Sequence, residues 1–198
     1  MRFRDHWSRT APLWAHGGAV LAWHLLPNGR LDSLSASLHA ALERPGLSPV
    51  PPQWLHLTTQ GVGLEHDVDD EIRRRLVAAA AERCAAVAPV DALAGPPRVV
   101  AEGLTLDVEP AALLSALRDL LQDADAAVRG RDAVPDWRAP FWPHITLAYA
   151  NGDAEAEEIE ARRPEPVRFD SVTLLRLHRS EQLYHWDVIA SVPLTGGA

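Results

Sequence analysis

The sequence predicts an α+β fold of two similar lobes with a central cleft between them. Three observations support this prediction. Strand-like and helix-like segments alternate along the chain, the tripeptide His-x-Thr occurs twice inside strand-like segments, and the two copies stand at comparable places in two half-chains. A chain of 198 residues is long enough for one domain whose lobes share a core. We therefore expect a single domain over 1–198, with lobes at 19–108 and 109–192 after an irregular N-terminal arm at 1–18.

The first half-chain contains four periodic segments, each followed by a turn signal. The apolar patterning predicts strands at 19–26 and 53–60 and helices at 31–42 and 67–87. The signals that end them are Pro27-Asn28-Gly29, Gly61-Val62-Gly63, Pro45-Gly46 and Pro89. Acidic residues open the second helix and arginines follow, as the helix dipole prefers.

The second half-chain continues the alternation and ends in a hairpin. Pro110 stands where the first turn of a helix tolerates proline, and 130–140 reads as a loop. The predicted strand at 98–108 closes the first lobe. In the second lobe the predicted strands are 141–149, 167–178 and 183–192, and the predicted helices are 111–128 and 155–163.

The charge balance argues against a large nucleic-acid-binding surface. The formal net charge is −8, whereas proteins that hold long nucleic acids usually present a basic face. All 19 basic residues are arginine, as a GC-rich coding bias alone would produce. A small phosphate pocket, or a site for an RNA terminus, remains compatible with this composition.

Sequence features also bear on the compartment. No apolar run is long enough to span a membrane, and the N-terminal segment lacks the clean apolar core of a signal peptide. The single cysteine, Cys84, excludes an intrachain disulfide and suits a reducing compartment. We expect a cytoplasmic monomer with no membrane partner.

The two His-x-Thr copies are His56-Leu57-Thr58 and His144-Ile145-Thr146. On a strand, residues i and i+2 point to the same face, so each copy would present an imidazole beside a hydroxyl. Two such pairs facing each other would supply a general base, a general acid and two hydrogen-bond donors around one small anion. The pattern therefore predicts a site that handles phosphoesters. The other histidines show no metal-ligand spacing and no cysteine pair exists, so we expect no metal.

These motifs, with an apolar residue after each histidine and this element order, resemble the 2H phosphoesterase superfamily. The likeness is closest to its RNA 2′,3′-cyclic phosphodiesterase or 2′-5′ RNA ligase family. The segment Pro143-His144-Ile145-Thr146-Leu147-Ala148 is very similar to that family's second motif, and Leu55-His56-Leu57-Thr58 fits the first. One departure is Thr59, where the family usually has an apolar residue.

The resemblance implies two antiparallel sheets with outer helices and a pseudo-twofold relation, with both motifs facing the cleft. It also implies metal-independent chemistry without a cofactor, on RNA ends or small cyclic nucleotides. By the same likeness, His56 and His144 form the catalytic pair, and Thr58 and Thr146 bind the phosphate. Because a histidine titrates near neutral pH, one imidazole can act as base and the other as acid. The sequence does not distinguish which histidine takes which role.

Six further residues are candidate substrate contacts. Tyr149 and Trp142 flank the second motif and could stack a base, and three of the others stand on predicted strands. For each of the six, ordinary packing or surface exposure is the competing interpretation. They are Tyr149, Trp142, Arg138, Arg176, His178 and His24.

We therefore expect an enzyme that opens 2′,3′-cyclic phosphates, on RNA ends or nucleotides, to 2′-phosphates. Reversible 2′-5′ RNA ligation is compatible with the same site. The alternatives are a phosphodiesterase acting on a small cyclic nucleotide metabolite, which the acidic charge favours, and a non-catalytic module that binds RNA or nucleotides.

Overall fold

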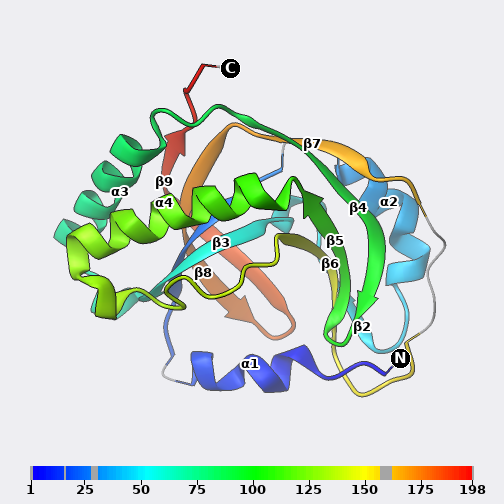
Figure 1. Cartoon of the computed structure of the whole chain (residues 1–198). Helices are drawn as coiled ribbons and strands as arrows, with labels where there is room; N and C mark the ends of the chain where they lie inside the picture. The colour runs from blue at the N-terminus through cyan, green and yellow to red at the C-terminus, as the bar shows by residue number, and fades with distance from the viewer. Residues whose placement is uncertain (1, 16, 28–30, 157–161, 198) are drawn as a thin grey trace.

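Two antiparallel sheets with helices on their outer sides form the molecule (Figure 1). The computed structural model describes residues 2–15, 17–27, 31–156 and 162–197. The first sheet has the order β3-β1-β8-β9, and the second has the order β2-β6-β5-β4-β7. The expected α+β class and the two antiparallel sheets are therefore confirmed.

The element bounds show how the two sheets share the chain. The first sheet comprises β1 (Val20–Leu25), β3 (Leu57–Leu64), β8 (Ser171–Ser180) and β9 (Leu183–Pro193). The second comprises β2 (Leu47–Pro49), β4 (Val90–Val100), β5 (Gly103–Glu109), β6 (His144–Ala150) and β7 (Glu165–Phe169). Each sheet takes strands from both 19–108 and 109–192, so the two sheets do not correspond one to one with the two predicted segments.

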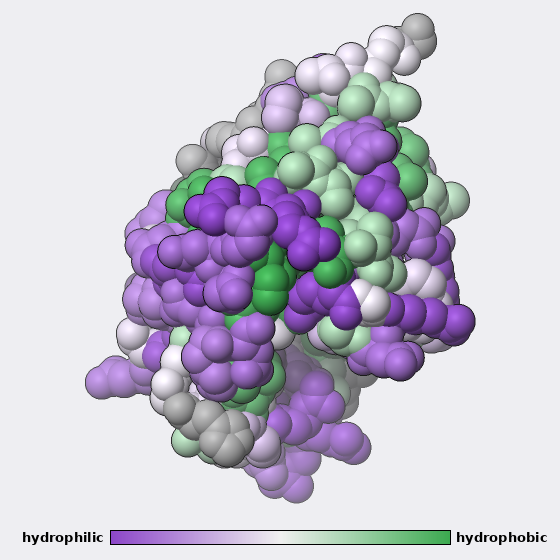
Figure 2. Space-filling view, turned by 90° about the vertical axis from the view of Figure 1, so that its left-hand side faces the viewer, coloured by the Kyte–Doolittle hydropathy of each residue, from purple (hydrophilic) through white to green (hydrophobic). Residues whose placement is uncertain are grey.

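Four α-helices accompany the sheets in the described part of the chain. They are α1 (His6–Trp14), α2 (Leu31–Leu42), α3 (Asp70–Cys84) and α4 (Ala111–Arg129), with short 3-10 turns at Pro52–Trp54, Glu65–Asp67 and Arg131–Ala133. Helices α3 and α4 pack together beside the first sheet, and α2 packs against the second. On the side where α3 and α4 lie, hydrophilic residues cover one part of the surface, and more apolar residues show between them and toward the upper right of the view (Figure 2).

Local chemistry explains where the long helices begin and end. The Asp69 side chain accepts a hydrogen bond from the Ile72 amide, which caps α3. Helix α4 follows Pro110 and stops at Gly130, whose positive φ of 86° suits glycine. The buried apolar residues of both helices and both sheets form one contiguous core.

Three sequence predictions of local structure are wrong. The arm at 1–18 contains α1, whose first turn is capped by Asp5. The predicted strand at 98–108 is the hairpin of β4 and β5. Gly103 opens β5 at φ 144°, where a side chain would collide with the Ala148 carbonyl. The Gly61-Val62-Gly63 segment continues β3 rather than turning. The predicted helix at 155–163 falls largely on 157–161, outside the described residues.

Candidate active site

The two motif strands lie against each other where the sheets meet. Strands β3 and β6 are in contact, His56 immediately precedes β3, and His144 begins β6. Both imidazoles are half-buried, Thr146 is half-buried, and Thr58 is exposed. The fold thus brings the two motifs, far apart in sequence, to one place.

Both motif histidines are anchored in the same way. The Nδ1–H group of His56 donates to the Trp54 carbonyl at 2.9 Å, and that of His144 donates to the Trp142 carbonyl at 2.8 Å. Because Nδ1 carries the donated proton in each ring, Nε2 is the nitrogen left for proton transfer. The repeat is therefore Trp-x-His-x-Thr in both copies, a signal in the sequence that reasoning from the tripeptide missed.

A β-bulge follows each motif threonine. On β3, Thr59 has no partner on β1, and on β6, Leu147 has no partner on β5. The buried Thr59 hydroxyl donates to the Trp23 carbonyl at 2.7 Å. The departure from the family pattern at Thr59 is thereby explained, since the hydroxyl is satisfied inside the sheet and leaves the motif geometry unaffected.

The bulge on β6 also places Tyr149. Without it, strict alternation would direct Tyr149 away from His144 and Thr146. Because one extra residue shifts the alternation, Tyr149 lines the same cavity as those two side chains. The structure therefore brings this predicted residue to the site.

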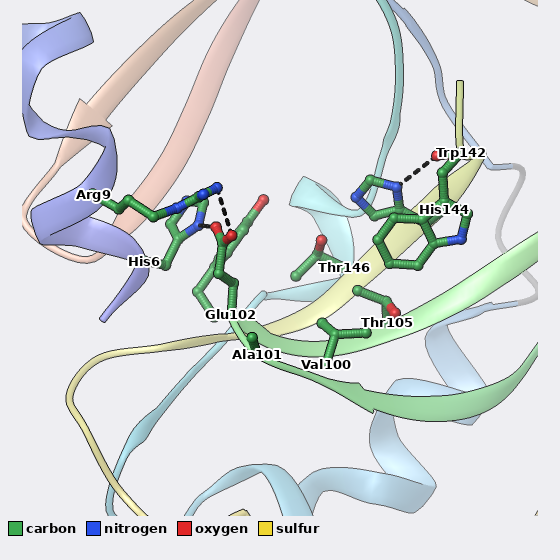
Figure 3. A pocket seen from close by; sticks show the side chains of 10 residues that line it. His6, Arg9, Val100, Ala101, Glu102, Thr105, Trp142, His144 and Thr146 are labelled. Atoms are coloured by element: carbon green, nitrogen blue, oxygen red, sulfur yellow. Dashed lines mark hydrogen bonds and ion pairs between the residues drawn. The ribbon is translucent and has the colours of Figure 1, made fainter. Parts of the chain in front are cut away.

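The cavity beside the second motif has a volume of about 450 Å³. Its two ends differ in chemistry: one carries the motif residues, and the other carries an ion-pair network (Figure 3). The lining residues are His6, Arg9, Val100, Ala101, Glu102, Thr105, Trp142, His144, Thr146 and Tyr149. Of these, His6, Arg9, Glu102 and Thr105 were not predicted from the sequence.

His56 lies among aromatic rings at the side of the first sheet. Its ring is 4.9 Å from the ring of His24 and 5.0 Å from that of Trp186, both edge to face. The pKa of His56 is lowered from 6.5 to about 4, mainly by burial, with the Trp54 carbonyl opposing the shift and the nearby charge of His144 adding to it. His56 is therefore a neutral imidazole at pH 7.

His144 is held by a different arrangement. Its ring stacks on Trp142 at 4.2 Å and 19°, while the Arg98 guanidinium lies 4.9 Å from the Trp142 ring. The Trp142 Nε1–H group donates to Asp107 at 2.8 Å, and Arg98 pairs with the same carboxylate. With neighbours at both its ring and its Nε1–H group, Trp142 is better suited to orient His144 than to stack a base.

The strands beside the motif strands carry equivalent polar residues. His24 on β1 is the register partner of Thr58, and Thr105 on β5 is the register partner of Thr146. Both are buried, and His24 Nε2 and Thr105 Oγ1 have no hydrogen-bond partner within the described residues. This correspondence supports the pseudo-twofold relation. His24, a predicted substrate contact, is fully buried, with its ring 4.9 Å from the ring of His56.

Arg138 does not reach the cavity. Its guanidinium pairs with Asp119 at 2.6 Å and Asp123 at 2.5 Å on α4, and it lies over the ring of Trp137. Acidic neighbours on α4 hold the Arg138 guanidinium, and the side chain is not among the residues that line the cavity.

Arg176 and His178 are also outside the cavity lining. Arg176 pairs with Glu65 at 2.6 Å. His178 Nε2 lies 3.2 Å from the Asp187 carboxylate, and its ring stacks on His185. Partners on neighbouring elements hold both side chains, and neither is among the residues that line the cavity of the second motif.

A metal site and a helical membrane span each require a particular arrangement of residues. Among the described residues, no group of three or more His, Cys, Asp or Glu side chains is placed to hold a metal ion. Within those residues, no helix is long and apolar enough to cross a bilayer.

Two antiparallel sheets that join a pair of His-x-Thr segments are the architecture of 2H phosphoesterases. The model of the 2′-5′ RNA ligase superfamily matches residues 29–181, and the chain belongs to that superfamily. No curated protein matches it in sequence.

Solved structures show the same fold. The protein TT0787 of Thermus thermophilus has a TM-score of 0.70 and 24% identity, over 90% of this chain and 100% of that one. LigT of E. coli, solved in complex with 3′-AMP, has a TM-score of 0.71 and 19% identity, over 89% and 98%. A further phosphoesterase structure has a TM-score of 0.71 and 18% identity, over 90% and 99%.

Proposed function

We propose that this protein is a phosphodiesterase that opens 2′,3′-cyclic phosphates to 2′-phosphates. Water attacks the phosphorus, the bond from phosphorus to O3′ breaks, and the product carries a 2′-phosphate and a free 3′-hydroxyl. A 5′-hydroxyl of RNA in place of water would form a 2′-5′ linkage by the same displacement.

The surroundings of the two histidines support a division of roles in hydrolysis, with His56 as the base and His144 as the acid. Burial holds the pKa of His56 at about 4, so its Nε2 is free to accept the proton of the attacking water at neutral pH. His144 then donates a proton from Nε2 to the departing O3′. Such positioned acid–base catalysis contributes about 10²–10⁴-fold for each group.

The threonines complete the proposed phosphate site. Thr58 and Thr146 stand two residues after the histidines, so their hydroxyls accompany the imidazoles and donate to the non-bridging oxygens as charge builds up. Tyr149 lines the same cavity beside Thr146. LigT of E. coli, which shares the fold, was solved in complex with 3′-AMP and with phosphate, and this supports the proposal of a phosphate-bearing ligand.

A small cyclic nucleotide suits this chain better than long RNA. The formal net charge of −8 opposes a polyanion, while the cavity of about 450 Å³ accommodates a compact ligand. The cyclic ester of one nucleotide is therefore the preferred substrate within the proposed reaction.

The matching anchors of His56 and His144, each with Nε2 left for proton transfer, carry this proposal. Purified protein should open a nucleoside 2′,3′-cyclic monophosphate in the presence of EDTA, and His56→Ala or His144→Ala should each lower the rate about 10²–10⁴-fold. Turnover that survives either change at the wild-type rate would refute the proposed mechanism.

A further inference from the structure

Helix α1 connects the two sheets across one end of the cavity. His6 Nδ1–H donates to Glu102, in the turn between β4 and β5, at 3.0 Å. His6 Nε2 lies 2.9 Å from the Tyr184 hydroxyl oxygen of β9, within hydrogen-bond distance. The buried Trp7 packs against Tyr149 and Tyr184. The helix is thus fixed to both sheets (Figure 1).

This helix precedes the part of the chain that the superfamily model matches, which begins at residue 29. The shared family pattern therefore does not account for it. Nevertheless it contributes His6 and Arg9 to the cavity wall, at the end away from His144 (Figure 3).

The hydrogen-bonding capacity of that wall is only partly used. Arg9 is 65% exposed, and within the described residues its one ion pair joins it to Glu102. A guanidinium has five N–H donors, and each carboxylate oxygen of Glu102 can accept more than one hydrogen bond. The pair therefore presents free donors beside free acceptors.

The charge of the wall distinguishes between ligand classes. The charges of Arg9 and Glu102 cancel, and burial lowers the pKa of His6, which disfavours a positive charge on this imidazole. A second phosphate would meet the Glu102 carboxylate, whereas a neutral group with both donors and acceptors would meet complementary partners. A nucleobase edge and the ribose hydroxyls have this character.

We propose that Arg9 and Glu102, held by α1, form a subsite for the nucleoside part of the substrate. The inference rests on the proposed function for the placement of the reacting phosphate at His144 and Thr146. The subsite selects a single nucleotide whose neutral, hydrogen-bonding end faces α1.

Calorimetric binding tests this subsite without turnover. The probes are adenosine 2′-monophosphate, adenosine 2′,5′-bisphosphate and inorganic phosphate. The variants are Arg9→Ala and Glu102→Gln, with Arg4→Ala as the control, because Arg4 is an exposed arginine near α1 outside the cavity lining.

Arg9→Ala should weaken the 2′-monophosphate about tenfold and leave inorganic phosphate unchanged. Glu102→Gln should weaken the same ligand to a smaller extent, the control should bind it as wild type does, and the 5′-phosphate should give no added affinity. Unchanged affinity of Arg9→Ala for the 2′-monophosphate would overturn the proposal. So would a gain from the 5′-phosphate that disappears in Arg9→Ala. If wild type binds these ligands as stated but opens no cyclic phosphate, the proposed reaction fails and the subsite stands.

Discussion

Trp186 should control the acidic limit of activity through His56. The indole of Trp186 contacts the His56 ring at 5.0 Å and also lies over His24. Replacing it with alanine admits water to His56, which removes part of the burial that disfavours the imidazolium. The pKa of His56 should then rise from about 4 toward 6.5.

The size of the effect follows from these two limits. A base with a pKa of 4 is about 97% neutral at pH 5.5, whereas one with a pKa of 6.5 is about 9% neutral. Trp186→Ala should therefore lower kcat/KM by up to about tenfold at pH 5.5 relative to its own value at pH 8. Wild type should show almost no such loss.

The assay is the pH dependence of kcat/KM for a nucleoside 2′,3′-cyclic monophosphate, with the His56 titration followed by NMR. Trp14→Ala is the matched control, since its ring contacts Tyr184 rather than His56. A wild-type acid limb near pH 6.5, or a limb that does not move in Trp186→Ala, would refute the reasoning.

Three further outcomes are expected. Trp142→Leu should lower kcat about tenfold to a hundredfold with little change in KM, and Trp142→Phe should lose less, because a flat ring still supports the imidazole; equal losses would contradict the stacking role. Thr59→Val should reduce the unfolding free energy in urea by about 1–3 kcal/mol, since the buried Trp23 carbonyl loses its hydroxyl donor, and an unchanged midpoint would count against this. Burial lowers the pKa values of His24 and His56, so the unfolded chain binds more protons below pH 6.5. The free energy of unfolding should accordingly decrease as the pH is lowered below 6.5, by up to about 1.4 kcal/mol per pH unit for each group. Equal stability at pH 7 and pH 5 would exclude this linkage.

Segments with a clear period and clear end signals were predictable from the sequence. Residues 31–42 form α2 with the predicted bounds, since the apolar spacing and the following Pro45-Gly46 agree. The hairpin of β4 and β5 was not predictable, because the turn at Ala101 and Glu102 has no strong turn residue before Gly103. Helix α1 was obscured by Pro12, which stands inside it.

At the candidate site, residue identity was predictable and surroundings were not. The tripeptides indicated the four motif side chains, but their symmetry concealed which histidine has the lowered pKa. The difference arises from His24 and Trp186, which reach His56 only through sheet pairing and folding. The ion pairs of Arg138 were likewise not predictable, since the carboxylates that hold this side chain lie on α4, well before it in the sequence.

The central claim is that His56 and His144 act on one phosphate through their Nε2 atoms. Nitrogen-15 NMR of the histidines during titration with a nucleoside 2′-monophosphate tests this directly. The account predicts that the Nε2 resonances of both residues shift along one binding curve with a single Kd, while both Nδ1 atoms stay protonated by their carbonyl anchors. A shift at only one histidine, or two different Kd values, would contradict it.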